Sequence, residues 1–349
     1  MTLGTKAPRN GRPTIRDVAR EAGVSIGTVS AVINDRGQVA EDTRRHVLRL
    51  IAELGFEPNN AARSLKHGRI SSIGFVVPDL QNPFFADVAE GVQRGIGNND
   101  ILLVLCATWS KTEREEYFAR ILRTQRLGGV IYLSGSGLPS PSLLELARAG
   151  LVVFVDEVLP GMDVPFVSSN NLAGARAIAR HVLDCGHRHL AIVGGPSRLW
   201  TSEQRLAGFR ESIAAAGLDP DVVPYVAGDY SERSGYLAAG QLLSGPKENW
   251  PTAILSANDL MAMGVMRYCR ESDIAIPGRL SITGFDDISA AEFLLPSLSS
   301  VAQPGMEMGR AAAELLLFRT GVREEPPSTT YFQTSVRIRD SVARIAPRA

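Results

Sequence analysis

The stretch from Thr14 to Asn34 reads TIRDVAREAGVSIGTVSAVIN and decides the fold of the amino-terminal region of the chain. Thr14 is a favourable N-cap residue, and small apolar residues follow it at helical spacing. Gly23 suits the left-handed conformation that ends a helix, and Ser25 suits the cap of a second helix. Two short helices joined by a glycine turn predict a helix-turn-helix, which many proteins use to read duplex DNA. An ordinary helical hairpin is the alternative, since short motifs also match by chance.

The residues that follow favour the helix-turn-helix. TRRHVLRLIAELGF, residues 43–56, predicts a third helix that ends at Gly55 and closes a small core. Its apolar face is expected to consist of Val47, Leu48, Leu50, Ile51 and Leu54. Residues 58–66 are too few to hold a helix alone in water, so this segment needs a partner or DNA to order it. Within it, Leu65 is either an ordinary exposed leucine or a wedge that enters the minor groove and unstacks a base step.

The outward positions of the second helix are mostly small or apolar. Ile26, Gly27 and Ala31 have no hydrogen-bonding side chain, so bidentate reading of base edges is predicted to be weak. Thr28 and Ser30 are expected to hold phosphates, and bending at the Leu65 wedge is expected to supply specificity. The expected DNA contacts are Thr14, Ser25, Ile26, Gly27, Thr28, Ser30, Ala31, Asn34, Ala62, Arg63, Leu65 and Lys66.

The composition agrees with a globular chain that binds nucleic acid at one end. At 349 residues and 44% hydrophobic content, the chain has room for a small domain and a larger domain with two lobes. Residues 1–69 carry 12 Lys and Arg against 7 Asp and Glu, whereas the remainder carries 25 against 30. A basic amino-terminal region suits the neutralisation of phosphates, although a solvated charged face gives the same count. No apolar run has membrane-spanning length, so we expect a cytoplasmic protein with no membrane partner.

From Ile70 onward, short apolar runs alternate with amphipathic helices. Runs such as SSIGFVV, GGVIYLS and HLAIVGG are too apolar for half-exposed strands. They predict parallel sheets that are covered on both faces, in an α/β body of two lobes.

The chain resembles the LacI/GalR family of bacterial transcription regulators, the lactose-repressor and purine-repressor type. The matching stretches run in order from Thr14 to Ser341: TIRDVAREAGVS, TVSAVIN, VAEDTR, ARSLK, SIGFVVPDLQNPFF, GHRHLAIVGG, RLAGF, ANDLMAMG, SITGFDD and QPGMEMGRAAAELLL. The resemblance implies an all-α helix-turn-helix head over 1–57, a hinge helix and linker over 58–69, and a periplasmic-binding-protein-like effector and dimerisation domain over 70–349.

The resemblance also implies how the two parallel-sheet lobes of the effector domain are built. The chain is expected to cross between them near Ser168, Ala302 and Thr329. The first lobe then takes about 70–168 and 303–329, and the second about 169–302 and 330–343. A ligand is expected in the cleft between the lobes, where loops converge at the carboxyl ends of strands.

The candidate effector residues follow the predicted strands. Arg205 matches a family arginine with a forked donor set, Asp286 offers an acceptor, and Asn258 offers both a donor and an acceptor. The rings of Phe84 and Phe85 suit stacking on a sugar or base face, unless they belong to the core. The expected effector contacts are Phe84, Phe85, Trp109, Asp156, Trp200, Thr201, Arg205, Tyr230, Asn258 and Asp286.

This residue set favours a sugar or sugar derivative as the effector, but other metabolites stay open. A carboxylate, an arginine, an amide and an aromatic face suit a polyhydroxylated ring. Trp109 stands where sugar-responsive members of the family tend to carry polar residues, and its ring is expected to narrow the site. Because Asp286 and Tyr230 also resemble purine-responsive members, a nucleobase is the alternative effector.

Other functions are weighed against regulation. HVLDCGHRH places His181, Cys185, His187 and His189 close together, but its match to a helix-to-strand junction of the family favours a structural role over a metal site. No nucleotide-binding or hydrolase motif is present, so we expect neither an enzyme nor a cofactor. A secreted sugar-binding protein is disfavoured by the DNA-binding head and by the missing signal peptide. The prediction is an allosteric regulator, a repressor, that binds a near-palindromic operator as a homodimer.

Overall fold

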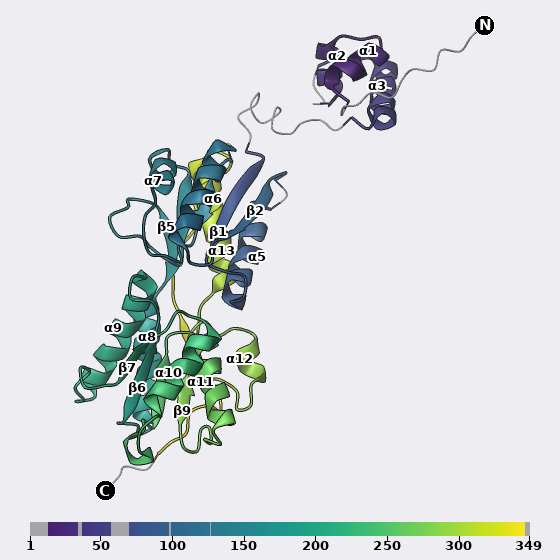
Figure 1. Cartoon of the computed structure of the whole chain (residues 1–349). Coiled ribbons are helices and arrows are strands. Elements are labelled where there is room, and N and C mark those ends of the chain that lie inside the picture. The colour runs from purple at the N-terminus through teal and green to yellow at the C-terminus, as the bar shows by residue number, and fades with distance from the viewer. Residues whose placement is uncertain (1–12, 34–36, 57–69, 98, 126, 346–349) are drawn as a thin grey trace. The chain divides into compact units, whose positions relative to one another are not determined.

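The computed structural model describes residues 13–33, 37–56, 70–97, 99–125 and 127–345 (Figure 1). The chain divides into two compact units, Met1–Ser71 and Ser72–Ala349. The predicted hinge segment, 58–69, lies outside the described residues.

In the described residues of the first unit, 13–33, 37–56 and 70–71, three helices form the head: α1 (Ile15–Glu21), α2 (Ile26–Ile33) and α3 (Glu41–Leu54). A capping box begins α1, in which the carboxylate of Asp17 accepts from the Thr14 amide at 3.0 Å and from the Thr14 hydroxyl at 2.7 Å. The hydroxyl of Ser25 accepts from the Thr28 amide at 3.0 Å and so caps α2. Gly55, with φ +63°, ends α3 in the left-handed conformation. These local signals therefore set the ends of the three helices.

One small apolar core holds the head together. Val18 and Ala19 of α1, Val29 and Val32 of α2, and Val47 of α3 are all buried in it. The prediction that Leu48 shares this face is wrong, since Leu48 is 48% exposed. It follows Val47 directly, and successive helical residues point about 100° apart.

The second unit consists of two α/β lobes (Figure 1). In the first lobe, six parallel strands run in the order β11-β5-β4-β3-β1-β2. The strands are β1 (Ser72–Val77), β2 (Leu102–Ala107), β3 (Val130–Tyr132), β4 (Val152–Val155), β5 (Phe166–Ser169) and β11 (Tyr331–Phe332), and the helices are α5 (Pro83–Ile96), α6 (Thr112–Thr124), α7 (Pro141–Arg148) and α13 (Gly305–Arg319). A Cβ on Gly91 of α5 would lie 2.0 Å from the carbonyl oxygen of Met306, so α5 and α13 pack with their backbones in contact.

In the second lobe, four parallel strands run in the order β7-β6-β8-β9, beside the antiparallel pair β10-β12. The strands are β6 (Leu190–Gly194), β7 (Tyr225–Ala227), β8 (Ala253–Ser256), β9 (Ser281–Thr283), β10 (Ser300–Ala302) and β12 (Ser335–Arg337), and the helices are α8 (Asn171–Asp184), α9 (Trp200–Ala215), α10 (Glu232–Leu242), η1 (Lys247–Asn249), α11 (Asp259–Glu271) and α12 (Ala290–Phe293). The central strands of both sheets are buried, as expected for sheets covered on both faces. The prediction of two parallel-sheet lobes is therefore confirmed.

The chain passes between the two lobes at three places. It leaves the first lobe after β5, returns between β10 and α13, and leaves again between β11 and β12. Because Tyr331 of β11 pairs with Ser168 of β5, the third crossing follows Phe332 and lies beyond the predicted position at Thr329. Within the described ranges, no helix combines the length and the apolar character that a bilayer-spanning segment needs.

Candidate functional site

A cleft of about 440 Å³ lies between the two lobes, a volume within the range of small-molecule sites. The first lobe contributes loops that follow β1, β2, β3 and β4. The second lobe contributes residues 196–199 and Thr201 around the start of α9, and Ala227, Asp229 and Tyr230 at and after the end of β7. The polar side chains of the lining include Asp79, Asn82, Ser134, Asp156, Glu157 and Asp229. Loops at the carboxyl ends of parallel strands therefore form the cleft.

Four of the predicted effector residues line this cleft: Phe85, Asp156, Thr201 and Tyr230. Oδ1 of Asp156 and the hydroxyl of Tyr230 are buried, and neither has a hydrogen-bond partner among the described residues. Burial raises the pKa of Asp156 to about 6 and that of Tyr230 to about 12. Both residues have left-handed backbones, with φ +64° and +69°, a conformation that is costly for residues other than glycine. Two strained residues thus present polar atoms that the protein leaves unsatisfied.

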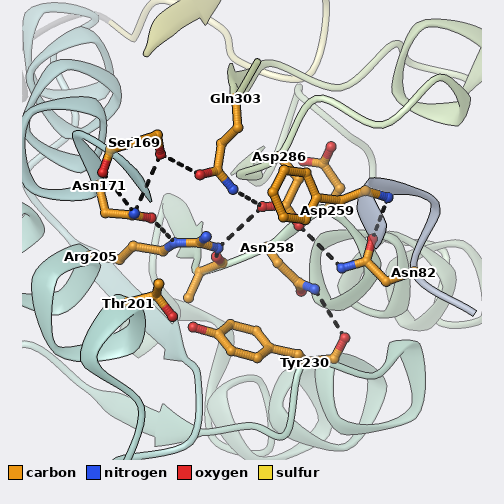
Figure 2. A network of polar contacts seen from close by, with 12 residues as sticks. Asn82, Ser169, Asn171, Thr201, Arg205, Tyr230, Asn258, Asp259, Asp286 and Gln303 are labelled. Atoms are coloured by element: carbon orange, nitrogen blue, oxygen red, sulfur yellow. Dashed lines mark hydrogen bonds and ion pairs between the residues drawn. The ribbon is translucent and has the colours of Figure 1, made fainter. Parts of the chain in front are cut away.

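Arg205 is buried beside the cleft, and Figure 2 shows its guanidinium near the centre of a polar network. Its Nε donates to Oδ1 of Asn171 at 2.8 Å, and its Nη1 donates to the carbonyl of Ala257 at 2.7 Å and to Oδ1 of Asp286 at 3.3 Å. The guanidinium carbon also lies 4.0 Å from the centre of the Phe285 ring. Contacts with α8, the loop after β8 and the loop after β9 hold the arginine in one orientation.

Asp286 joins both lobes to this network. Besides Arg205, it accepts from Nε2 of Gln303 at 2.9 Å and from Nδ2 of Asn82 at 3.4 Å. Asn82 also caps α5 of the first lobe, through its Oδ1 and the Phe84 amide, and it lines the cleft. Burial raises the pKa of Asp286, although Arg205 and these donors act in the opposite direction. Arg205 and Asp286 do not line the cleft themselves, but a hydrogen bond connects them to a residue that does.

Asn258 uses both ends of its side-chain amide within the protein. Its Oδ1 accepts from the Met261 amide at 2.9 Å and caps α11, while its Nδ2 donates to the carbonyl of Tyr230 at 3.0 Å. The side chain predicted to bind an effector therefore holds the loop that carries Tyr230.

Three predicted aromatic contacts lie elsewhere. Phe84 is 3% exposed and packs against Gly305, so it belongs to the core, the alternative considered for this ring. Trp109 is 59% exposed, and its ring lies 4.0 Å from the guanidinium of Arg114, so it does not narrow the cleft. Trp200 does not line the cleft and contributes its backbone amide to a contact between the lobes.

Glu157 forms that contact and is absent from the predicted set. It follows β4 of the first lobe and is 2% exposed. Its Oε1 accepts from the Trp200 amide at 2.6 Å, and its Oε2 accepts from the Thr201 hydroxyl at 2.7 Å and from the Thr201 amide at 3.4 Å. One signal in the sequence pointed to such a partner: the N-cap residue of α9 is Leu199, whose side chain accepts no hydrogen bond.

The candidate DNA-binding surface belongs to the head. Thr14, Ser25, Ile26 and Gly27 are exposed, and Thr28, Ser30 and Ala31 are half-buried on α2. The other predicted contacts, Asn34, Ala62, Arg63, Leu65 and Lys66, lie outside the described residues. A partly exposed α2 that is capped by Ser25 is the arrangement expected of a recognition helix.

His187 of the histidine-rich stretch has a structural environment. Its Nδ1 lies 2.9 Å from the Thr252 hydroxyl, and its Nε2 lies 3.0 Å from the carbonyl of Ala343. Both ring nitrogens are thus engaged by the protein.

Comparison with known proteins identifies the family. Residues 14–59 match the model of the bacterial regulatory proteins of the lacI family, and residues 179–342 match that of the periplasmic binding protein-like domain. The HTH-type transcriptional regulator CelR of Thermobifida fusca is 34% identical over 340 residues, which cover 95% of this chain and 99% of CelR. The chain belongs to the LacI family. A second LacI-family relative, the HTH-type transcriptional repressor PurR of Escherichia coli, is 33% identical over 319 residues, covering 90% of this chain and 93% of PurR.

Solved structures of the LacI family agree. A complex of the transcriptional regulator CelR with cellobiose matches with a TM-score of 0.67 and 32% identity, covering 95% of this chain and all of that one. The Lac repressor dimer bound to operator and the anti-inducer ONPF matches with a TM-score of 0.81 and 26% identity over the same shares. The chain is therefore a LacI-family DNA-binding transcriptional regulator with a periplasmic-binding-protein-like effector domain. Since its relatives are regulators, the prediction that it is not an enzyme is confirmed.

Proposed function

We propose that this LacI-family regulator is a repressor whose operator affinity is controlled by a sugar or sugar derivative bound in the cleft. The buried, unpartnered Oδ1 of Asp156 and hydroxyl of Tyr230 carry this proposal. A sugar hydroxyl is both a donor and an acceptor, so adjacent hydroxyls satisfy a carboxylate and a phenol together. The partly exposed ring of Phe85 in the same lining supplies an apolar face for the sugar ring. The complex of CelR with cellobiose supports this class of effector.

On DNA, the proposed active species is a homodimer on a near-palindromic operator. One head offers one recognition helix and reads one half-site, so a two-fold pair of chains matches a two-fold site. In the second lobe, Phe293 is 80% exposed and Leu295 is 97% exposed, and such apolar side chains suit burial against a second copy. Effector binding changes operator affinity to the extent that the effector prefers one arrangement of the lobes.

The test of the effector class is thermal unfolding of the full chain against neutral sugars, polyols, sugar acids, sugar phosphates and nucleobases. All three tryptophans, Trp109, Trp200 and Trp250, lie in the effector domain, so their emission reports that domain. A ligand that binds the folded domain raises its midpoint in a concentration-dependent way. We expect such a rise with a neutral sugar. A rise with a nucleobase and with no sugar would replace the sugar by the alternative effector.

The first variant to test is Asp286→Ala. We expect it to abolish the rise in midpoint, because the orientation of Arg205 and Asn82 depends on this carboxylate. Binding to duplex DNA selected from a random pool should persist, since the head is a separate compact unit. Glu90→Gln, at an exposed ion pair with Arg94, is the matched control and should respond to the sugar as the wild type does. A normal response of Asp286→Ala would show that the effector binds elsewhere.

A further inference from the structure

The amino end of α9 has no cap of its own. This 16-residue helix begins after Leu199, and no side chain at that position accepts from the first amides. Unsatisfied amides at a helix amino end, together with the helix dipole, make a binding site for an anion. In this protein, the carboxylate of Glu157 occupies that position from the other lobe.

The contact is built from both sides. Thr201 adds its hydroxyl to the two backbone amides, so three donors converge on one carboxylate. Nearby, a Cβ on Gly137 of the first lobe would lie 2.4 Å from the carbonyl oxygen of Arg198 of the second, so the loops on either side meet closely. An anionic group of a ligand cannot reach the α9 amides while Glu157 holds them.

The remaining charges of the lining act in the same direction. Asp79, Asp156 and Asp229 line the cleft together with Glu157, against one cationic lining residue, Arg198, among those the structure describes. These side chains offer an anionic group acceptor oxygens in place of donors, and the negative charge of the aspartates disfavours its binding.

We infer that Glu157 is a specificity-determining residue, which takes the place of an anionic group of the effector at α9 and makes the cleft selective for uncharged polyhydroxylated ligands over phosphorylated ones. This inference rests on the proposed function of the cleft as the effector site.

The test places a reporter beside the contact. In a full chain that carries Trp109→Phe and Trp250→Phe, Trp200 at the start of α9 is the remaining tryptophan. Its emission is followed as inorganic phosphate or glucose 6-phosphate is added to this parent and to its Glu157→Ala derivative at constant ionic strength. We expect saturable binding by Glu157→Ala that is at least about tenfold tighter than binding by the parent, because the freed amides and hydroxyl form charge-assisted hydrogen bonds.

The matched control is Glu116→Ala. Glu116 accepts from the Ser142 amide at 2.9 Å and from the Ser142 hydroxyl at 2.6 Å, near the amino end of α7, so the change removes the same kind of acceptor group within one lobe. Emission from Trp200 in this control should respond as in the parent. Circular dichroism verifies that each variant is folded, and if Glu157→Ala does not fold, Glu157→Val, which also lacks an acceptor oxygen, takes its place with the same expected gain in anion binding.

Two outcomes overturn the inference. One is equal anion affinity in the parent and the folded Glu157 variant, and the other is a stabilising effect of a sugar phosphate on the wild-type chain. If a neutral sugar stabilises the wild type but the variant binds anions no more tightly than the parent, the proposed function stays in place and this role of Glu157 is removed. Tighter anion binding by the variant, with no sugar stabilising the wild type, would leave Glu157 as the group that blocks the α9 amides but would remove the proposed function and the selectivity for neutral sugars.

Discussion

Asp17 and Glu157 both satisfy amides at helix amino ends, and their surroundings are opposite. Asp17 of the head accepts from Thr14, three residues away, on a stretch of α1 that is open to solvent. Hydrogen bonds from Thr14 and Arg20 hold its pKa well below its usual range. Glu157 accepts from Trp200 and from a residue 44 positions away, Thr201, inside the cleft between two lobes. Burial raises its pKa to about 8.

A cap supplied by a nearby residue and a cap supplied by a distant residue act differently. The bond between Asp17 and Thr14 fixes the start of one helix, and this start can form before the rest of the fold exists. The bonds between Glu157 and Thr201 form only when the two lobes of the effector domain come together. A local cap therefore specifies secondary structure, whereas a cap that spans the cleft couples the arrangement of the lobes to the site between them.

Of the changes to buried contacts between distant residues, we expect Arg205→Met to lower the free energy of unfolding the most. The change leaves the buried carboxylate of Asp286 without its ion-pair partner, and removal of one partner from a buried pair costs about 3–5 kcal/mol. Urea unfolding followed by tryptophan emission measures the free energy of unfolding of the effector domain.

The control for this prediction is Arg267→Met. Arg267 forms ion pairs with Glu232 and Glu271 on the surface of the second lobe, where solvent weakens them. We expect little change in the unfolding midpoint for this variant. Equal losses for the two arginines would show that the buried network has no special weight.

The next effect is a dependence of stability on pH that has opposite signs in the two units. The pKa of Glu157 is raised from its usual 4.5 to about 8, so the folded effector domain binds this proton more tightly than the unfolded chain does. Its contribution is fully present below pH 4.5 and is lost as the pH rises through 8. Asp17 has a lowered pKa, so its contribution to the head is present above its usual value of 3.8 and is lost in more acidic solution.

The contribution of Glu157 is isolated by comparison with Glu157→Gln. Asp156, Arg205 and Tyr230 interact electrostatically with Glu157 and are unchanged in the variant. His187, whose pKa is lowered by burial, is also present in both proteins. The thermal midpoint of the wild type, followed by tryptophan emission, should fall relative to that of Glu157→Gln as the pH rises from about 5 to about 8.5. A difference that is constant over this interval would contradict the raised pKa of Glu157.

The same contrast explains which features the sequence revealed. The starts of α1 and α2 were predictable because Thr14, Asp17 and Ser25 bond to residues at most three positions away. The parallel strands were predictable because their apolar runs are continuous. Within the cleft, the predicted Asp156 and Tyr230 lie together because both follow strands whose carboxyl ends face the cleft.

The rest of the site depended on partners that no local pattern marks. Gln303 contacts Asp286 and Ser169, and Glu157 contacts α9, each across a chain crossing or between lobes. Trp109 was misplaced for a related reason, since an aromatic residue after a strand packs as well under a surface arginine as in a cleft. Only the apolar N-cap of α9 carried a trace of the missing contact in the sequence.

The smallest losses of stability are expected when a single hydrogen bond of each cap is changed. Thr201→Val removes the hydroxyl that donates to Glu157, and a net loss of about 0.5–1.5 kcal/mol is usual for one such bond. Asp17→Asn keeps an oxygen acceptor for Thr14 but removes the charge, so its effect on the head, followed by the helical signal in circular dichroism, should be smaller. Added salt screens exposed charges more than buried ones, and the effect of Asp17→Asn should therefore fade at high ionic strength while that of Thr201→Val persists. Equal sensitivity to salt would mean that the two caps do not differ in the way that their burial indicates.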